Sequence, residues 1–471
     1  MKLRVGCVII GFLALALSLQ AQTFTFTTLH SFDGTDGTNP HAGLVQATDG
    51  NLYGTTYLGG ADNDGTVFKI TPSGTLTTLH SFAGYPTDGG NPDAGLVLAT
   101  NGDLYGTTYE GEASDAGAVF KITPGGKLKI LYSFCSQINC TDGYFPYAGL
   151  VQATNGYFYG TTYLGGTNNQ GTVFRIITPS DTLKTLHSFD ITTNPMDGVE
   201  PYAGLVQASD GNFYGTTYGG GSYLYGTVFK ITTNGTLTTL HSFDVTDGYF
   251  PTAGLVQATD GNLYGTTFAG GANDQGTVFK ITPSGTLTTL YNFDVTHGAY
   301  PWAGLVQATD GNLYGTTYAG GANGQGTIFK ITIGATPTLT KLYDFCSLSG
   351  CTDGYEPVAG LVQATSGELY GTAEEGGVNG DGTVFSLSVG LGPFVETLPT
   401  SGKVGAEVTI LGNGLANASS VTFNGTAATI TADKSSEITT TVPTGATTGT
   451  VEVTTAKGKK LKSNVVFRVT P

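Results

Sequence analysis

Two groups of carboxylates interrupt loops that otherwise carry few charges. Glu374 and Glu375 follow the second predicted strand in the last of seven repeated units, and Glu110, Glu112 and Asp115 occupy the equivalent loop of the second unit. A pair of carboxylates can act as acid and base on a glycosidic bond. Residues adjacent in sequence rarely face each other at the working distance. We therefore expect these carboxylates to be solvated loop residues. The alternative is that they catalyse the cleavage of a polysaccharide, as in a glycosidase or lyase.

Aromatic residues gather in the loops that lead into the first strand of each unit, which we call lead-in loops. An aromatic ring offers a large, rigid and weakly polar surface, which suits flat ligands such as sugar rings. Packing of the rings between neighbouring units is the competing interpretation for each of them. The residues expected to contact a ligand are Trp302 (the only Trp in the chain), Tyr300, Tyr249, Phe250, Tyr202, Tyr147, Tyr144 and Tyr355, with Glu374 and Glu375.

Six of the seven lead-in loops contain the sequence Asp-Gly-x-x-Pro. The aspartates could form a ring of calcium ligands, but Asp before Gly also makes a side-chain-to-backbone turn. A part that recurs in every unit is more often scaffold than site. We therefore expect a structural role and no cofactor, with calcium at these loops as the alternative. The aspartates are Asp36, Asp88, Asp142, Asp197, Asp247 and Asp353, and His297 replaces them in the sixth unit.

The sequence contains no Ser/His/Asp triad, phosphate-binding glycine loop or zinc signature. A copper oxidase would need two histidines that converge near the axis. The lead-in loops contain only His41 and His297, which belong to the first and sixth units. We therefore expect a protein without catalytic residues.

The chain begins like an exported protein. Lys2 and Arg4 precede an apolar run over residues 8–19, and Ala21 provides a small residue for cleavage. Residues 1–21 are therefore predicted to be a signal peptide. The expected location is extracellular, at the cell surface or periplasmic.

Four further cysteines form two C-x4-C pairs at equivalent places in the third and seventh units. In an oxidising compartment, local disulfides Cys135–Cys140 and Cys346–Cys351 are expected. A metal site is the alternative, but no histidine accompanies either pair.

The formal net charge of −16 argues against a nucleic-acid partner, which normally meets a basic face. Only 11% of the residues are charged. Gly, Thr, Tyr, Val and Leu are abundant instead, which is typical of β-structure with glycine-marked turns. No apolar run is long enough to span a bilayer. We expect a monomer with no membrane-spanning segment.

A repeat of about 50 to 56 residues organises most of the chain. In the fifth unit, strands are predicted over 253–259, 262–268, 276–282 and 286–293. Gly265, in the middle of the second strand, predicts the close approach of another backbone. Four short antiparallel strands are typical of a propeller blade, so residues 22–390 are predicted to form a seven-bladed β-propeller. The Ala-Gly-Leu triplets that mark the repeat begin at Ala42, Ala94, Ala148, Ala203, Ala253, Ala303 and Ala359.

The two ends of the repeat array predict that it is closed. Residues 24–32 read as a fourth strand without the first three, whereas the last unit, residues 359–389, has three strands and no fourth. The N-terminal strand is therefore expected to complete the last blade, which removes an open sheet edge. The longer, variable loops of all units then share one face, where binding is expected.

Residues 393–471 follow a different pattern of alternating strands and Gly or Pro turns, which predicts a small β-sandwich. The strings Pro399-Thr-Ser-Gly402, Gly412-Asn-Gly414 and Val442-Pro-Thr-Gly-Ala446 resemble the IPT/TIG family of immunoglobulin-like domains. This resemblance implies an Ig-like fold with a spacer or adhesion role and no shared catalytic residues.

The repeats themselves, as in Gly254–Thr267 and Gly276–Thr282, are similar to the GloVer-type tandem-repeat proteins of bacteria, a choice-of-anchor family. That family pairs its repeats with varied C-terminal surface anchors, and we find no sorting segment here. The leading hypothesis is a secreted or surface-displayed, non-catalytic protein that binds polysaccharide or other cell-surface components through the variable loops. The alternatives are an extracellular enzyme acting on polysaccharide and a purely structural component of the envelope or matrix.

Overall fold

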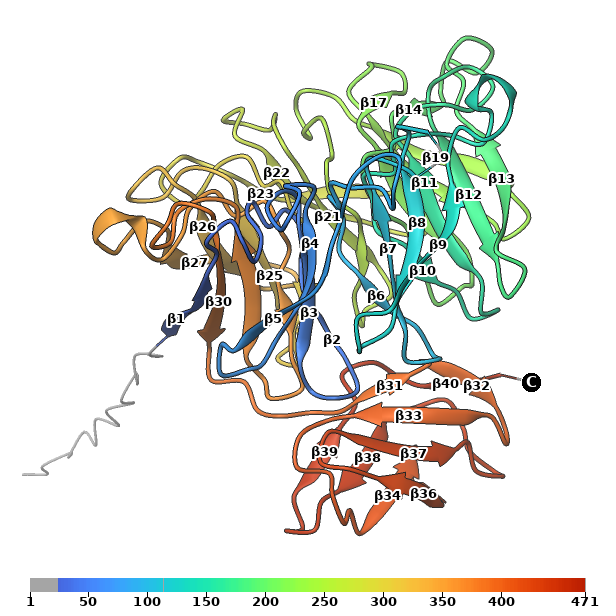
Figure 1. Cartoon of the computed structure of the whole chain (residues 1–471), viewed down its shortest axis with the longest axis vertical. Helices are drawn as coiled ribbons and strands as arrows, with labels where there is room; N and C mark the ends of the chain where they lie inside the picture. The colour runs from blue at the N-terminus through green and yellow to red at the C-terminus, as the bar shows by residue number, and fades with distance from the viewer. Residues whose placement is uncertain (1–23, 113, 471) are drawn as a thin grey trace, which may run out of the picture.

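The computed structural model describes residues 24–112 and 114–470, which consist of β-strands, loops and two 3-10 turns, η1 (Ile138–Cys140) and η2 (Ser349–Cys351), without any α-helix (Figure 1). The all-β expectation is therefore confirmed. The predicted signal peptide, residues 1–21, lies outside the described residues. Within the described ranges, no helix has the length and apolar character needed to cross a membrane.

Each repeat forms a four-stranded antiparallel sheet in which the strands follow one another in chain order. In the fifth unit the strands are β20 (Val256–Gln257), β21 (Leu263–Thr267), β22 (Thr277–Ile281) and β23 (Leu287–Asn292). The last three agree with the predicted ranges to within a residue or so. The first is much shorter than predicted, because only two residues of the Ala-Gly-Leu-Val-Gln segment pair with β21.

The other units repeat this plan. Their first strands are β2 (Val45–Gln46), β6 (Val97–Leu98), β10 (Val151–Gln152), β15 (Val206–Gln207), β24 (Val306–Gln307) and β28 (Val362–Gln363). Their second strands are β3 (Leu52–Thr56), β7 (Leu104–Thr108), β11 (Phe158–Thr162), β16 (Phe213–Thr217), β25 (Leu313–Thr317) and β29 (Leu369–Ala373). Their third strands are β4 (Thr66–Ile70), β8 (Ala118–Ile122), β12 (Thr172–Ile177), β18 (Thr227–Ile231), β26 (Thr327–Ile331) and β30 (Thr383–Ser388). The fourth strands of units one to four and six are β5 (Leu76–Ser81), β9 (Leu128–Ser133), β13 (Thr182–Ser188), β19 (Leu237–Ser242) and β27 (Leu339–Asp344). A short ribbon, β14 (Gly198–Val199) with β17 (Gly219–Gly220), joins two loops of the fourth unit.

The seventh unit takes its outer strand from the beginning of the chain. Strand β1 (Thr25–Ser31) pairs with β30 in antiparallel register, from Thr25 opposite Ser388 to Ser31 opposite Thr383. Figure 1 shows the two strands side by side although more than 350 residues separate them. The expectation that residues 24–32 supply the missing strand of the last unit is confirmed.

Contacts between neighbouring units also run from the last unit to the first. The first Thr after the mid-strand Gly donates a hydrogen bond to the Ala carbonyl of the next Ala-Gly-Leu triplet, as Thr55 does to Ala94 at 3.1 Å. Thr372 of the seventh unit donates in the same way to Ala42 of the first, also at 3.1 Å. The sheets therefore resemble propeller blades arranged around a common axis.

The hydrophobic core lies between neighbouring sheets. One cluster joins Tyr214 and Phe243 of the fourth unit to Leu255, Phe279 and other apolar side chains of the fifth. The second and third strands are buried on both faces, whereas the fourth strands are half exposed. This explains why the inner strands are nearly continuous in apolar residues and Thr while polar residues gather in the outer ones.

Side chains, rather than another backbone, surround the mid-strand glycine, so the prediction of a close backbone approach at Gly265 is wrong. A Cβ at this position would lie 2.6 Å from Cζ of Phe279 and 2.7 Å from Cδ2 of Leu255. The ring of the neighbouring strand thus lies directly over the glycine Cα.

Replacing this glycine should therefore overpack the core. Gly265→Ala is expected to lower the free energy of unfolding by about 1–3 kcal/mol, the usual range for inserting a methyl group into a filled core. Chemical denaturation of the variant beside Gly125→Ala measures the effect, because the nearest atom to a Cβ at Gly125 is 3.8 Å away. A neutral Gly265→Ala would contradict the packing described.

The C-terminal region, residues 393–470, forms separate sheets below the repeat sheets (Figure 1). It has its own core, which includes Ile410, Phe423, Ile438, Val453 and Phe467. Two four-stranded sheets have the orders β31-β33-β37-β36 and β35-β34-β38-β39, and β32 pairs with β40 in parallel. The strands are β31 (Glu396–Leu398), β32 (Ser401–Lys403), β33 (Glu407–Leu411), β34 (Ser420–Phe423), β35 (Thr426–Ala428), β36 (Ile430–Asp433), β37 (Glu437–Thr441), β38 (Val451–Thr454), β39 (Lys460–Lys462) and β40 (Arg468–Thr470).

This region packs against the repeats where one unit departs from the pattern. In six units, a Gln at the end of the first strand accepts a backbone N–H from the preceding unit, as Gln46 does from Thr365 at 2.8 Å. The second unit has Leu98 at this place, and Leu98 joins an apolar cluster that contains Leu411 of the C-terminal region. Ser436 donates a hydrogen bond to the carbonyl of Thr48 beside it, at 2.7 Å.

Candidate ligand-binding site

One position of each lead-in loop projects into a shared cavity at the centre of the repeat sheets. It is the single residue between the Pro of Asp-Gly-x-x-Pro and the Ala-Gly-Leu triplet, and six residue types occur at this position among the seven units. All seven of these residues line a cavity of about 540 Å3, together with the seven Ala-Gly pairs. We call it the axial cavity. The seven variable residues are His41, Asp93, Tyr147, Tyr202, Thr252, Trp302 and Val358.

The invariant neighbours of this position explain how it is placed. The Ala carbonyl that follows is held by the inter-unit Thr hydrogen bond, and a Cβ on each triplet Gly would lie 3.0–3.4 Å from the carbonyl oxygen of the preceding unit's triplet Gly. These contacts fix the backbone of the Ala-Gly-Leu triplet. They do not restrict the type of side chain at the variable position directly before the triplet. A second position, directly after the second strand, adds Tyr57, Tyr318 and Glu374 to the lining.

His41 connects two carboxylates across the cavity wall. Its Nδ1 lies 2.6 Å from Oδ1 of Asp93, and its Nε2 lies 3.2 Å from Oε1 of Glu374. The imidazole also stacks on the ring of Tyr57, with the centroids 4.6 Å apart. Burial by itself would lower the pKa of His41, but the hydrogen bonds and negative charges of Asp93 and Glu374 outweigh it and raise the pKa to about 9. His41 is therefore an imidazolium at neutral pH.

This shift makes stability depend on pH. The unfolded chain loses the His41 proton near pH 6.5 and the folded chain near pH 9, so the stabilisation is fully present below the lower value and is lost as pH rises through the higher one. We expect the free energy of unfolding of the wild type, relative to His41→Gln, to fall by roughly 2–3 kcal/mol over that window. Denaturation of both proteins from pH 6 to pH 9.5 measures the difference. A constant difference would contradict the charged bridge.

Aromatic rings form the opposite side of the axial cavity. Tyr147 and Tyr202 stack with centroids 4.8 Å apart and planes at 19°. Trp302 meets Tyr202 edge-on at 5.9 Å. The Tyr202 hydroxyl reaches Oδ2 of Asp93 at 3.5 Å, which brings the aromatic and acidic sides together.

Of the residues expected to contact a ligand, Tyr147, Tyr202, Trp302 and Glu374 line the axial cavity. Others pack against the preceding unit: Tyr300 stacks on Phe268 at 5.1 Å and Phe250 on Tyr218 at 4.5 Å. The remaining ones occupy the outer loops. The hydroxyl of Tyr249 bonds Asp274, that of Tyr144 bonds Asn169, and the backbone of Tyr355 pairs with that of Glu375.

The two neighbouring glutamates of the seventh unit have different partners. Glu374 accepts from His41 in the axial cavity, whereas Oε1 of Glu375 accepts from Nδ2 of Asn39 at 3.2 Å. Burial and the charge of Glu374 raise the pKa of Glu375. The carboxylates of Glu374 and Glu375 therefore make separate contacts and do not face a common substrate position.

Five of the residues that line the axial cavity were not identified by sequence reasoning as ligand contacts: Asp93, Tyr57, Tyr318, Thr252 and Val358. His41 was considered only as a copper ligand. For Asp93, Thr252 and Val358, the signal that could have found them is a variable residue between two constant neighbours, Pro and Ala-Gly. This signal is visible in the sequence only when the seven units are aligned position by position.

The aspartates of Asp-Gly-x-x-Pro shape the lead-in loops. Asp36 bonds Nε2 of His30 at 2.7 Å, and Asp247 bonds His241 in the same way. Where Tyr replaces the His, its hydroxyl donates to the aspartate instead, as Tyr132 does to Asp142 at 2.7 Å. Among the residues that the structure describes, no group of three or more His, Cys, Asp or Glu side chains is arranged to hold a metal ion.

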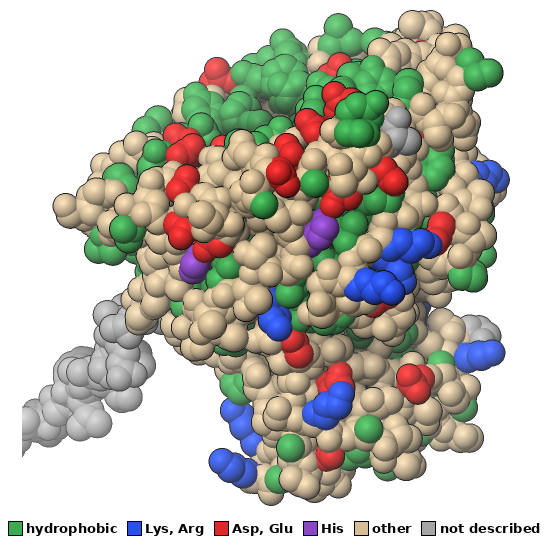
Figure 2. Space-filling view, in the orientation of Figure 1, with side chains coloured by type: hydrophobic (Ala, Val, Ile, Leu, Met, Phe, Trp, Pro, Cys, Tyr) green, Lys and Arg blue, Asp and Glu red, His purple; other side chains and the backbone are tan. Residues whose placement is uncertain are grey.

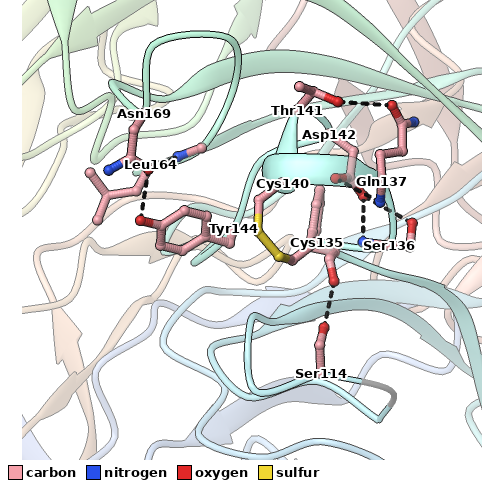
Figure 3. The surroundings of a disulfide bond; sticks show 12 residues. Ser114, Cys135, Ser136, Gln137, Cys140, Thr141, Asp142, Tyr144, Leu164 and Asn169 are labelled. Atoms are coloured by element: carbon pink, nitrogen blue, oxygen red, sulfur yellow. Dashed lines mark hydrogen bonds between the residues drawn. A yellow bond between two sulfur atoms is a disulfide. The ribbon is translucent and has the colours of Figure 1, made fainter.

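The two C-x4-C pairs form the expected disulfides, Cys135–Cys140 and Cys346–Cys351. Each closes a loop that contains a 3-10 turn, at the outer edge of the lead-in loop. Figure 3 shows how Asp142, just after the first of these loops, accepts hydrogen bonds from Ser136 and the neighbouring backbone within the loop. These hydrogen bonds occupy both carboxylate oxygens of Asp142. We therefore interpret the two disulfide loops as structural extensions of the lead-in loops.

Charge is distributed unevenly over the molecule. Acidic side chains gather on the upper part in Figure 2, where the lead-in loops lie, whereas most Lys and Arg lie lower and on the C-terminal region. Burial and the charges of Asp115 and Asp64 raise the pKa of Glu110 on that acidic face. No Lys or Arg is present among the described residues that line the axial cavity. The charged side chains of its lining are His41, Asp93 and Glu374.

Among solved structures, virginiamycin B lyase from Staphylococcus aureus is 15% identical over 78% of this chain and 99% of its own, with a TM-score of 0.53. A fungal alcohol oxidase of the AA5 family, in complex with copper, is 12% identical over 95% of this chain and 99% of its own, also with a TM-score of 0.53. At such identities the likeness concerns the fold alone. No curated protein matches the chain.

The repeat sequence does identify a family. The Gloeobacter/Verrucomicrobia repeat matches residues 15–208, 191–385 and 307–470 in three overlapping copies. These ranges cover most of the sequence. The chain therefore belongs to the Gloeobacter/Verrucomicrobia repeat family.

Proposed function

We propose that this protein is a secreted or surface-displayed, non-catalytic binding protein that holds a carbohydrate in the axial cavity. The observation that carries the proposal is the set of seven variable residues, His41 to Val358, which converge on one cavity while their neighbours stay constant. The immediate neighbours, Pro on one side and Ala-Gly-Leu on the other, are the same in all seven units. Variable side chains on a rigid frame are typical of a ligand site.

The proposal includes the architecture that displays the site. Residues 22–390 would form a seven-bladed β-propeller closed by the N-terminal strand, and residues 393–471 an Ig-like domain of the IPT/TIG type that acts as a spacer. The pairing of β1 with β30 and the separate core of the C-terminal region support this division. The predicted signal peptide and the two disulfides support an oxidising, extracellular setting.

The contents of the cavity support carbohydrate as the ligand. Trp302, Tyr202 and Tyr147 offer ring faces, and Asp93, next to the Tyr202 hydroxyl, and Glu374 offer hydrogen-bond acceptors in the same cavity. Stacked rings with a few convergent polar groups suit a sugar, which has apolar faces and a hydroxylated edge. Both ring nitrogens of His41 are held by carboxylates, so its protons are engaged with them, which favours binding over acid–base catalysis.

The test is a binding screen against polysaccharides and bacterial envelope fractions with a variant in which the cavity is filled. Val358→Trp adds an indole to the lining, and Val378→Trp adds the same group to an outer loop, where Val378 is 75% exposed. We expect the first variant to lose at least about 1.4 kcal/mol of binding free energy, which is tenfold in affinity, and the second to bind like the wild type. Binding that survives Val358→Trp would place the site elsewhere, and a folded protein that binds nothing would favour a structural envelope component.

A further inference from the structure

We infer that the carbohydrate bound in the axial cavity is an amino sugar, held through its protonated amino group. The inference rests on the proposed function, because it specifies the class of saccharide at the same site. It follows from the charge of the lining, from the hydrogen-bonding groups that remain free in it, and from the separation of an acidic side from an aromatic side.

The charge of the lining is negative. His41, Asp93 and Glu374 are the charged residues among the described residues of the cavity wall, and His41 carries one positive charge against two carboxylates. One negative charge is therefore uncompensated within a partly enclosed space. The negative charge of Glu374 also reaches the neighbouring carboxyl group of Glu375. A cation entering the cavity gains from this potential, and an anion is repelled.

The hydrogen-bonding capacity that remains on His41, Asp93 and Glu374 consists of acceptors. His41 uses one ring nitrogen on Asp93 and the other on Glu374. Each ionised carboxylate accepts at about four lone-pair sites and donates none. Oδ2 of Asp93 meets the Tyr202 hydroxyl only at the long distance of 3.5 Å. An ammonium group, with three donors and no acceptor, complements such a surface better than a hydroxyl or an amide does.

The aromatic side complements the rest of an amino sugar. Trp302 and Tyr202 present an edge-to-face pair, and Tyr147 continues it toward Asp93. A pyranose ring stacks its C–H face on such rings, and an adjacent ammonium gains a cation–π attraction as well as the carboxylate contact. A simple amine would leave the rings uncovered, and a uronic acid would bring a carboxylate against Asp93 and Glu374.

The experiment compares matched oligosaccharides on the full chain by calorimetric titration. The probes are a β-1,4-linked glucosamine oligomer, its fully N-acetylated counterpart and a uronic acid oligomer of the same length. About pH 5.5 keeps amino groups of this kind largely protonated. Salt at about 0.15 M limits attraction by the net charge of the whole protein to roughly 8 Å.

We expect the glucosamine oligomer to bind at least about tenfold more tightly than the N-acetylated one, and the uronic acid oligomer not to bind. Asp93→Asn should reduce the ratio of the two affinities to below about threefold. Glu374→Gln is the second variant, in case Asp93→Asn fails to fold. Asp62→Asn removes the same charge from an exposed loop and should keep the preference.

Equal binding of the amino and N-acetylated oligomers, abolished by Val358→Trp, would overturn this inference and leave the proposed function intact. A preference that Asp62→Asn reduces as much as Asp93→Asn would also overturn it, because the attraction would then come from the overall charge. If no saccharide binds, both the inference and the proposed function fail.

Discussion

A chain that lacks residues 24–32 is expected to lose cooperative folding of the repeat sheets. Strand β1 covers β30 over six residue pairs. Its Phe26 stacks on Tyr343 with the ring centroids 3.9 Å apart, and Phe32, just after it, is completely buried against the first unit. Removing a buried Phe costs about 3–5 kcal/mol. The loss of Phe32, the smaller loss from the partly buried Phe26 and an open sheet edge together approach the whole stability of an ordinary domain, about 5–15 kcal/mol.

Calorimetry or circular dichroism on heating measures this outcome. The deletion should lower the melting temperature by more than about 10 °C or abolish the main transition, because each kcal/mol shifts the midpoint by a few degrees. Thr27→Ala, at an exposed position of the same strand, is the control and should melt like the wild type. A deletion variant with a wild-type melting temperature would show that β1 is dispensable and that the ring is closed by other contacts.

Trp302→Ala is expected to weaken ligand binding by at least about thirtyfold. Trp302 lines the axial cavity and meets Tyr202 and Phe268 edge-on, at 5.9 and 5.2 Å. A buried aromatic anchor of this kind commonly contributes about 2 kcal/mol or more to an interface. No other residue of the wall offers an equivalent surface at that place.

The matched control lies two residues earlier in the same loop. Tyr300 stacks on Phe268 and lies outside the cavity lining. Tyr300→Ala removes an aromatic ring of similar size, and its affinity should stay within about threefold of the wild type, as expected for a residue outside the contact. Titration of both variants with the saccharide found in the screen decides the matter. A larger loss for Tyr300→Ala would place the site on the outer loops.

The fold was largely predictable because the seven copies of the repeat show the same pattern of strands and turns. Short runs of apolar residues and Thr, bounded by turn sequences such as Asp260-Gly261 and Pro283-Ser-Gly285, locate β21, β22 and β23 to within a residue or so. The unpaired strand at residues 24–32 predicts its pairing with the last unit, which the register of β1 on β30 confirms. The environment of Gly265 was not predictable, because the sequence alone does not show whether a backbone or the Phe279 ring covers it.

The site was less predictable because its parts are far apart in the chain. His41 lies 52 residues from Asp93 and 333 residues from Glu374, so no local sequence pattern shows that the three side chains meet. Counting aromatic residues in the lead-in loops favoured Tyr300 and Phe250, which pack against the preceding unit, as strongly as Trp302 and Tyr202, which face the axis. The direction of a side chain within a loop depends on backbone geometry that residue type does not determine.

The most direct test of the central claim uses the fact that Trp302 is the only Trp in the chain. Its fluorescence therefore reports on the axial cavity alone. Titration of the wild-type protein with a binding saccharide should shift or quench this emission, and the change should saturate with the same dissociation constant that calorimetry gives. Saturable binding by calorimetry with unchanged Trp302 emission would contradict a ligand in the axial cavity.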